Sequence, residues 1–258
     1  MTNYLHEGFE KTRNAGAIAS GALDEVFKII KPGISTNEID KLCFEYINDN
    51  NAYSAPLFYR GFPKSCCTSS NHVVCHGIPS EKILKDGDIL NVDVTAFKDG
   101  WHGDTSRMFC IGDVSIKASK LIKTTYEAMM KAINILNKES YVGDIGSTIQ
   151  NFVEKEGFSV VRDFCGHGIG KKFHLEPNIL HYGKKGVGPK LKEGMIFTIE
   201  PMINEGKYNT KTLNDGWTAV TKDKTLSAQF EHTVGITKDG YEIFTSSKKG
   251  LDFPPYKT

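Results

Sequence analysis

Four carboxylates and one histidine stand in short segments that otherwise resemble buried strands or glycine-rich turns. Asp93 and Asp104 lie on either side of a turn, His167 is bracketed by glycines, and Glu200 and Glu231 lie in later apolar runs. A lone carboxylate is costly to bury, and four that converge on one pocket repel one another strongly unless cations bind between them. If the fold brings these five side chains together, the chain is a metalloenzyme.

The two aspartates flank a Lys98-Asp99-Gly100 turn, which predicts a β-hairpin within residues 89–111. A turn centred between Lys98 and Asp99 would make Asp93 and Asp104 direct cross-strand partners, with Cβ atoms about 5 Å apart. A turn centred on Asp99-Gly100 shifts the register by two residues. Both registers keep the aspartates on one face, because side chains alternate along a strand. A pair of metal ions about 3.5–4 Å apart would suit them.

Helical periodicity predicts two pairs of helices, each followed by strands. The first pair is a helix over residues 5–30 and a second helix whose start is marked by a capping box, Ser35 with Glu38. The later pair begins with a helix over residues 118–138 and is interrupted at Val142-Gly143-Asp144. The order of elements therefore repeats along the chain.

This repeat predicts a single catalytic domain, residues 1–258, made of two similar halves at about 1–112 and 113–258. The four carboxylates divide evenly between the halves. Ligand pockets occur preferentially at such junctions, so we expect the site where the halves meet.

The net charge of +1 argues against an obligate nucleic-acid binder and predicts no sequence-specific nucleic-acid partner. The six cysteines form no C-x-x-C pair, which disfavours a zinc knuckle and fits a reducing compartment. The N-terminus has no apolar run after a basic start, and no window approaches 18 apolar residues. We therefore expect a cytoplasmic protein without a membrane partner.

One imidazole nitrogen and four carboxylates make a hard, oxygen-rich ligand set that Co, Mn, Fe or Zn could occupy, and the sequence does not choose among them. The expected chemistry is hydrolysis by a metal-bridged hydroxide that attacks a scissile carbonyl, because bound metals lower the pKa of water and polarise carbonyls. His76 and His174 also stand near glycine-rich turns, which favours a functional role over an ordinary buried one.

The chain resembles type I methionine aminopeptidases nearly end to end. The resemblance rests on six segments: Val73-Val-Cys-His-Gly-Ile-Pro, Asn91-Val-Asp-Val-Thr, His102-Gly-Asp-Thr-Ser, Cys165-Gly-His-Gly-Ile-Gly, Phe197-Thr-Ile-Glu-Pro-Met and Ser227-Ala-Gln-Phe-Glu-His-Thr. It implies the α+β pita-bread fold, in which two pseudo-symmetric halves place helices outside a curved antiparallel sheet. The chain has no cysteine-rich extension and no long insertion after His174, which is similar to the short, bacterial-like members.

The resemblance also implies two divalent metal ions and the residues that hold them. Asp93 would chelate one metal, His167 and Glu200 the other, and Asp104 and Glu231 would bridge the two. Glu200 matches the residue that shuttles the proton of the attacking water.

Further roles follow from the same resemblance. His174 matches the residue that binds the scissile carbonyl and its oxyanion, and His76 matches one that contacts the substrate backbone and helps proton movement at the leaving amide. The implied substrate-binding residues are Tyr59, Phe62, Cys67, His76, Phe173, His174 and Trp217. A monovalent cation, Na⁺ or K⁺, is implied beside Asn91, Val94 and Ser227. Pro56 stands where relatives often carry a cysteine, so we expect that wall of the pocket to differ.

The activity implied is removal of the initiator methionine from nascent proteins whose second residue is small. Its partners would be N-terminal methionyl peptides and nascent chains, with the ribosome as a further partner and a monomer as the expected state. The alternative is a proline-directed, prolidase-like metallopeptidase of the same fold, although such relatives usually carry an additional N-terminal domain. A non-catalytic peptide-binding module is the third reading, disfavoured because all five ligands are present.

Overall fold

Two ten-residue strands that alternate inward and outward side chains form the centre of the molecule, β4 (Ile89–Lys98) and β5 (Trp101–Cys110). They are joined by Asp99 and Gly100, whose φ angles of 49° and 84° give the positive-φ backbone of a two-residue hairpin turn. The hairpin expected from the sequence is therefore present. The computed structural model describes residues 2–254 and 256, with side chains from residue 7 onward.

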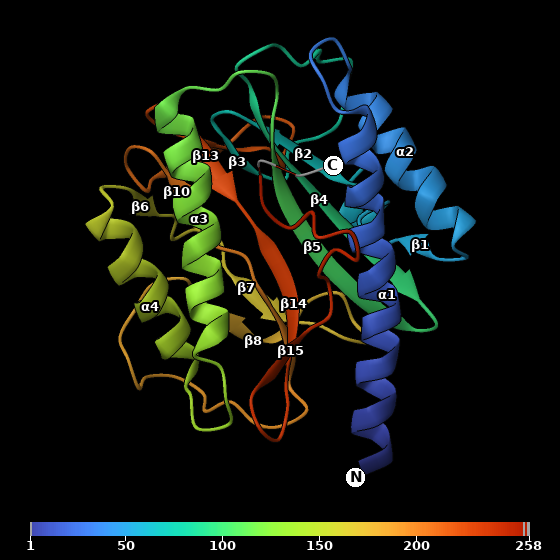
Figure 1. Ribbon diagram of the computed structural model, residues 1–258, viewed down its shortest axis with the longest axis vertical. Coiled ribbons are helices and arrows are strands. Elements are labelled where there is room, and N and C mark those ends of the chain that lie inside the picture. Colours follow the sequence, from blue (N-terminus) through green and yellow to red (C-terminus); the bar gives the residue numbers. More distant parts are fainter. Residues whose placement is uncertain (1, 255, 257–258) are drawn as a thin grey trace.

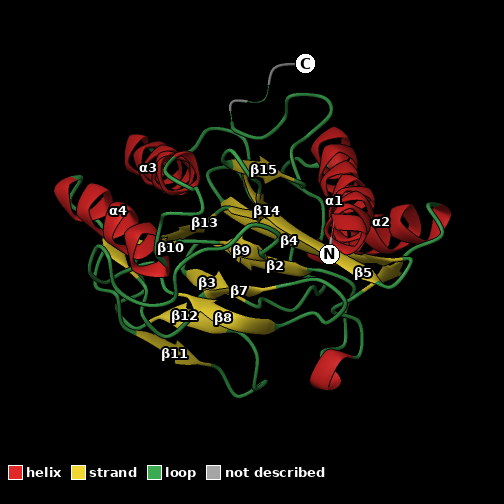
Figure 2. Cartoon of the chain, turned by 90° about the horizontal axis from the view of Figure 1, so that it is seen from below, coloured by secondary structure: helices red, strands yellow, loops and turns green. Residues whose placement is uncertain are grey.

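The hairpin belongs to a nine-stranded, antiparallel, curved sheet (Figures 1 and 2). Its other strands are β1 (Tyr53–Ser54), β2 (Cys67–Ser70), β7 (Gly166–Gly168), β8 (Leu175–Ile179), β9 (Ile196–Ile199), β14 (Glu231–Ile236) and β15 (Tyr241–Ile243). The order is β1-β4-β5-β14-β9-β7-β8, with β2 also paired to β4 and β15 to β14. The sheet thus joins strands from both predicted halves through the β5–β14 pairing.

Two three-stranded sheets lie beside the main one. The first has the order β13-β10-β6, and its strands are β13 (Ser227–Gln229), β10 (Met202–Asn204) and β6 (Ser159–Val160). The second has the order β11-β12-β3, and its strands are β11 (Thr210–Thr212), β12 (Ala219–Thr221) and β3 (Val73–Cys75). A short 3₁₀ turn, η1 (Tyr59–Gly61), follows β1.

Four helices cover the outside of the main sheet in two pairs, as Figure 2 shows from below. They are α1 (Thr2–Ile29), α2 (Thr36–Asp49), α3 (Ile116–Asn134) and α4 (Val142–Lys155). The predicted capping box is formed: Ser35 Oγ accepts the Glu38 N–H at 3.2 Å, and Glu38 Oε2 accepts the Ser35 N–H at 2.7 Å. Among the described residues, none of the helices is long and apolar enough to cross a membrane.

The predicted break between the later helices is wrong in position. Helix α3 ends at Asn134 rather than near residue 138, and Val142 already begins α4. Gly143 is needed for close packing instead, because a Cβ there would lie 2.4 Å from the Lys184 carbonyl oxygen and 2.5 Å from that of Val187. The glycine lets the start of α4 lie directly against this loop.

Each helix pair buries its own apolar cluster against the sheet. Under α1 and α2, residues such as Leu23 and Ile39 pack with Leu90 and Phe109 of the hairpin. Under α3 and α4, the cluster extends to strands β9 and β14. The architecture confirms the expected α+β fold with helices outside a curved antiparallel sheet, and it leaves the opposite, concave face free for a site.

A buried ion pair fastens α1 to the hairpin. Arg107 of β5 is 1% exposed, and its Nη1 donates to Asp24 Oδ1 at 2.6 Å. Its Nη2 donates to the Ser20 carbonyl at 3.1 Å, and the Ser247 hydroxyl donates to Asp24 at 2.8 Å. These contacts join α1, β5 and the C-terminal segment at one point.

Removing one partner of this pair should be strongly destabilising, because it leaves the other charge buried and uncompensated. We expect Asp24→Ala to lower the free energy of unfolding by about 3–5 kcal/mol in denaturant titrations. Glu242→Ala is the matched control, since Glu242 pairs with Arg13 at the surface and its loss should cost under about 1 kcal/mol. Equal losses in the two variants would contradict the assigned role of the buried pair.

Candidate metal centre

The β4–β5 register places the two aspartates diagonally on one face of the hairpin. Lys98 pairs with Trp101, so the turn is centred on Asp99-Gly100, which is the second of the two registers considered above. Asp93 lies opposite Ser106, and Thr95 lies opposite Asp104. The Thr95 hydroxyl donates to Asp104 Oδ1 at 2.6 Å and so fixes the carboxylate.

Strand β14 extends this row across the sheet. Glu231 is the register partner of Ser106, which itself faces Asp93 on the other side. Glu200 comes directly after β9, one step beyond the pair His232–Ile199, and this register brings it beside Glu231. Strand pairing alone therefore gathers carboxylates from segments more than one hundred residues apart.

His167 is the central residue of the short strand β7. Its N–H donates to the Thr198 hydroxyl at 3.0 Å, which ties it to β9. Gly166 and Gly168 permit this position, because a Cβ on either would lie 2.4 Å or less from a neighbouring carbonyl oxygen. The glycines that bracket the histidine thus let its strand fit between β8 and β9.

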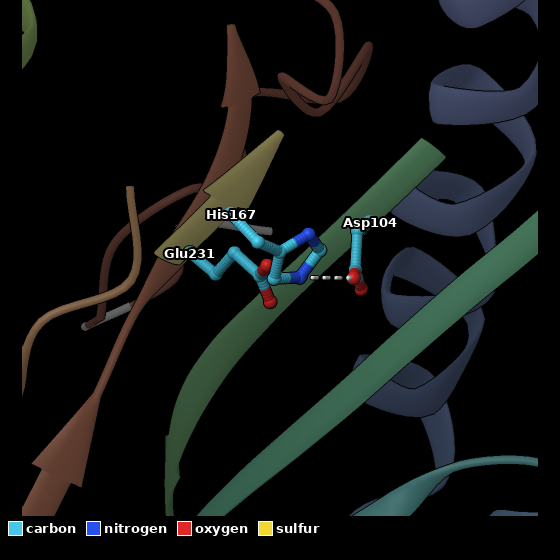
Figure 3. A group of neighbouring side chains, drawn as sticks. All are labelled: Asp104, His167 and Glu231. Atoms are coloured by element: carbon cyan, nitrogen blue, oxygen red, sulfur yellow. Dashed lines mark ion pairs between the residues drawn. The ribbon is translucent and has the colours of Figure 1, made fainter. Parts of the chain in front are cut away.

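The five predicted ligands, Asp93, Asp104, His167, Glu200 and Glu231, line one cavity of about 450 Å³. His167 Nε2 lies 3.7 Å from Asp104 Oδ2 and 3.6 Å from Glu200 Oε1. Ligand atoms of Asp104, His167 and Glu231 lie within 4.8 Å of one another, and Figure 3 shows the three side chains pointing toward a common point.

The charge state of these groups is strongly perturbed. Burial raises the pKa of Asp93 to about 7 and that of Glu200 to about 8. Burial, together with the neighbouring carboxylates, raises the pKa values of Asp104 and Glu231 well above their ordinary range. Glu200 and Glu231 are close enough that each shifts the pKa of the other.

These observations fit a metal site. Carboxyl groups that are kept protonated by burial and mutual repulsion lie where a bound cation would relieve the same repulsion. His167 supplies a neutral nitrogen, since burial lowers its pKa to about 4. Its Nδ1 lies 3.1 Å from the Gly168 carbonyl, and because a carbonyl only accepts, Nδ1 carries the proton and Nε2 presents a lone pair. The donor set therefore suits divalent cations.

Several residues that sequence reasoning missed hold the ligands in place. The Thr198 hydroxyl donates to Glu200 Oε1 at 2.7 Å, and Gln229 Nε2 donates to Oε2 at 3.3 Å. The Glu200 N–H donates to Nε2 of the fully buried His181 at 3.1 Å. Only the threonine carried a sequence signal, since it stands two residues before the carboxylate on the same strand face.

The two further histidines approach the cavity from loops. His76 follows β3 with a φ of 55°, and its ring meets Phe164 and Trp217 edge-on at 5.4 and 6.3 Å. His174 Nδ1 lies 3.0 Å from the Tyr59 hydroxyl, and its ring centre is 4.2 Å from that of His167. Burial lowers the pKa of both His76 and His174, so both are neutral near pH 7.

Mostly aromatic residues form a wall of the cavity beside the carboxylates, here called the aromatic wall. The predicted pocket residues Tyr59, Phe62, Cys67, His76, Phe173, His174 and Trp217 all line the cavity, as does Pro56. Behind this wall His102, which sequence reasoning did not assign, stacks on Phe173 at 5.5 Å with a 12° interplanar angle. Phe173 stacks in turn on His174 at 4.2 Å, so a column of rings that begins at the buried His102 supports the histidine.

Two of the residues predicted beside a monovalent cation hydrogen-bond to other groups of the chain. Asn91 Nδ2 donates to Ser106 Oγ at 3.1 Å and to the Gln229 carbonyl at 2.8 Å, whereas its buried Oδ1 has no hydrogen-bond partner among the described residues. The Ser227 hydroxyl donates to Asn204 Oδ1 at 2.8 Å. The side chain of Val94 lies in the core under α1 and α2, so only its backbone could contact an ion.

The chain is similar in sequence to known metallopeptidases. Residues 10–238 match the model of metallopeptidase family M24. The chain is 57% identical over 259 residues to methionine aminopeptidase from Rickettsia prowazekii. This alignment covers 99% of this chain and 100% of that protein. It is 52% identical over 244 residues to methionine aminopeptidase from Escherichia coli strain K12, covering 94% of this chain and 92% of that protein.

Solved structures of similar proteins have the same fold. The crystal structure of the Rickettsia prowazekii methionine aminopeptidase superposes with a TM-score of 0.92 and covers 93% of this chain and 97% of that chain. Prolidase from Pyrococcus furiosus superposes with a TM-score of 0.74 at 23% identity, which shows a shared fold. The match covers 94% of this chain but 64% of the prolidase, so the prolidase is the longer protein.

Loss of Asp104 should abolish binding of a divalent metal pair, because this carboxylate, His167 and Glu231 have ligand atoms within 4.8 Å of one another. We expect Asp104→Asn and Asp104→Ala to weaken Mn²⁺ binding by more than about 100-fold, since losing a residue that only supports a ligand already costs about 10–100-fold. Calorimetry and metal analysis would measure this. Asp99→Asn, in the turn of the same hairpin, should bind metal normally, and unchanged metal content in the Asp104 variants would refute the site.

The raised carboxylate pKa values predict that the metal-free protein loses stability as the pH rises from 6.5 to 8. In this range the folded state holds protons that the unfolded state has already released, so the free energy of unfolding falls with pH. The buried histidines have lowered pKa values and are already neutral in the folded state, so they oppose the change only near pH 6.5, where their unfolded forms still release protons.

We expect a decrease of about 1–3 kcal/mol in chelator-treated protein, measured by denaturant titration at several pH values. Excess Mn²⁺ should reduce or reverse the decrease, because cation binding displaces these protons. A metal-free stability that is constant or rises between pH 6.5 and 8 would contradict the carboxylate assignment.

Proposed function

Because the chain belongs to the methionine aminopeptidases of metallopeptidase family M24, we propose that its carboxylate–histidine cavity is the catalytic centre for removal of an N-terminal methionine. The protein is accordingly a metal-dependent hydrolase and an exopeptidase. The observation that carries the proposal is that all five candidate ligands, two neutral histidines and an aromatic wall line a single cavity. Each of these parts has a task in such a reaction.

Two divalent cations, Co, Mn, Fe or Zn, would be held by the five ligands. Asp93 would hold one ion, His167 and Glu200 the other, and Asp104 and Glu231 would bridge them. Bound there, the ions would lower the pKa of the attacking water and polarise the scissile carbonyl. The raised pKa of Glu200 and the free Nε2 lone pair of His167 support this assignment.

The chain's own groups would manage protons. Glu200 would accept the proton of the attacking water, a task for which a carboxylate of raised pKa is suited. When Tyr59 donates its hydroxyl hydrogen to His174 Nδ1, Nε2 carries a proton and can donate to the scissile carbonyl oxygen. His76 would contact the substrate backbone and assist proton transfer to the leaving amine.

The aromatic wall would select methionine. A flexible thioether fits an irregular apolar slot and makes favourable contacts with ring edges. Phe62 and Trp217 meet edge-to-face with ring centres 5.2 Å apart, and Tyr59 and Phe173 lie 5.0 Å apart, which gives the slot two rigid sides. Cys67 completes its floor.

The physiological substrates would be nascent chains that begin with methionine followed by a small residue. His76 and His174 line the cavity, and at the positions proposed for them they would limit the room for a bulky second side chain. Such substrates emerge at the ribosome in the cytoplasm, and the six unpaired cysteines fit that reducing compartment. We expect a monomer.

A monovalent cation, Na⁺ or K⁺, would lie next to the metal pair. The unpartnered, buried Oδ1 of Asn91 supports this, since a bare carbonyl oxygen suits a hard cation. The Ser227 hydroxyl and the Val94 carbonyl would complete the contacts.

The chain would act as one catalytic domain, residues 1–258, with halves meeting near residues 112 and 113. The supporting observation is that Asp93 and Asp104 come from the first half, whereas His167, Glu200 and Glu231 come from the second. Neither half alone would hold the site.

The decisive experiment follows methionine release from chelator-treated protein. We expect added Mn²⁺, Co²⁺, Fe²⁺ or Zn²⁺ to restore cleavage of Met-Ala-Ser but not of Ala-Pro peptides, because the slot is built for a thioether. Leu-Ala-Ser is the matched control for the first side chain. Cleavage of the prolyl peptide would support a prolidase-like activity instead, and inactivity with every metal would support a binding module.

A further inference from the structure

The segment from Pro56 to Phe62 forms one rim of the cavity and has an unusual backbone. Phe58 and Arg60 are non-glycine residues with φ angles of 65° and 48°, and Gly61 follows with 88°. Phe58 N–H donates to the Phe62 carbonyl at 2.8 Å, and Tyr59 N–H donates to that of Pro56 at 2.9 Å. Such conformations persist where the surroundings fix them, and they are common in segments that bind ligands.

This backbone presents Arg60 at the mouth of the cavity. The side chain lines the cavity while remaining exposed to solvent. Its guanidinium carbon lies 5.3 Å from the centre of the Tyr59 ring, which is within the range of a cation–π contact. No carboxylate of the described residues forms an ion pair with Arg60, so its charge is available to a ligand.

Arg60 lies close to the group proposed to bind the scissile carbonyl. Tyr59, on which Arg60 stacks, contacts His174 Nδ1 at 3.0 Å. Burial, then the rings of His167 and His76, and then the charge of Arg60 lower the pKa of His174 to about 3. Through Tyr59, the guanidinium is thus one side chain away from His174.

The direction of the substrate follows from the same geometry. With the methionine side chain in the aromatic slot and the carbonyl at His174, the rest of the peptide must leave through the mouth of the cavity. An extended peptide advances about 3.3 Å per residue, so the third residue lies at the rim. Asp163, which lines the cavity in addition to the four carboxylates of the candidate metal site, accepts a hydrogen bond from the Thr210 hydroxyl at 2.6 Å, which satisfies part of its charge.

We propose that Arg60 determines specificity downstream of the cut, by binding a carboxylate on the third residue of the substrate. The enzyme then favours chains that begin Met-small-Asp or Met-small-Glu over chains with Lys or Arg at the third position. This inference rests on the proposed aminopeptidase function and adds a preference to it. Arginine suits the task, because its planar guanidinium can donate two parallel hydrogen bonds to a carboxylate.

The contact has a defined kinetic signature. It forms in the bound substrate and persists through the reaction, so it should change KM more than kcat. Because the guanidinium is exposed, salt should weaken the preference. These two features separate direct binding by Arg60 from an indirect effect on the fold of the rim.

The test compares three peptides on the metal-loaded enzyme, Met-Ala-Asp-Ser, Met-Ala-Asn-Ser and Met-Ala-Lys-Ser. We expect the acidic peptide to have a kcat/KM about three- to tenfold above that of the lysine peptide, with the neutral peptide between them. Arg60→Gln should bring the ratio to about one, and Arg60→Glu should invert it, while the neutral peptide changes less than about twofold. Lys41→Gln, on the outer face of α2, is the matched loss of an exposed cation and should keep the wild-type ratio.

The outcomes are distinct. An equal rate for the three peptides with the wild-type enzyme, or a preference that survives in Arg60→Gln, would overturn the inference. A uniform loss of activity on all three peptides in both Arg60 variants would also overturn it, since Arg60 would then only support the loop. Failure of the wild-type enzyme to release methionine from any of the peptides would instead refute the proposed function.

Discussion

The mutual repulsion of buried carboxylates is the constraint on which the rest of the structure depends. Asp93, Asp104, Glu200 and Glu231 are brought to one cavity, although burial and proximity raise the pKa of each. A fold driven by burial alone would separate such groups. Without metal, protons relieve the repulsion at some cost in stability, and divalent cations can relieve it while supplying chemistry. The opposing stability comes from the two apolar clusters and the buried Arg107 ion pair on the far face.

Antiparallel pairing is what makes the gathering of ligands reliable. The row from Asp93 through Ser106 to Glu231 crosses three hydrogen-bonded strands, so its geometry is fixed by backbone register rather than by flexible side chains. A slip of one residue would turn each ligand to the opposite face. The β5–β14 pairing is therefore both the joint between the halves and the floor of the site.

The sequence predicted the features that depend on local pattern. Alternation and the Asp99-Gly100 turn fix one face for Asp93 and Asp104 in either register, and Ser35 with Glu38 marks a helix start. Residues that matter through contacts distant in sequence were missed. Gln229 and His181 contact Glu200 only because separate strands and loops meet there, and Gly143 looked like a helix breaker although it serves a close contact. The family resemblance supplied the roles of His76 and His174, which no local pattern reveals.

The candidate metal ligands and several other cavity residues lie on different kinds of element. The candidate metal ligands lie on strands or directly beside them, where register holds them within the tolerance that metal coordination requires. His76 and His174 lie on connecting segments, and Arg60 lies in the short turn η1. A residue at the rim can change without disturbing the strand register beneath it. Substrate preference in this fold can therefore vary at the rim while the carboxylate cluster, whose charges must remain matched to its cations, stays fixed.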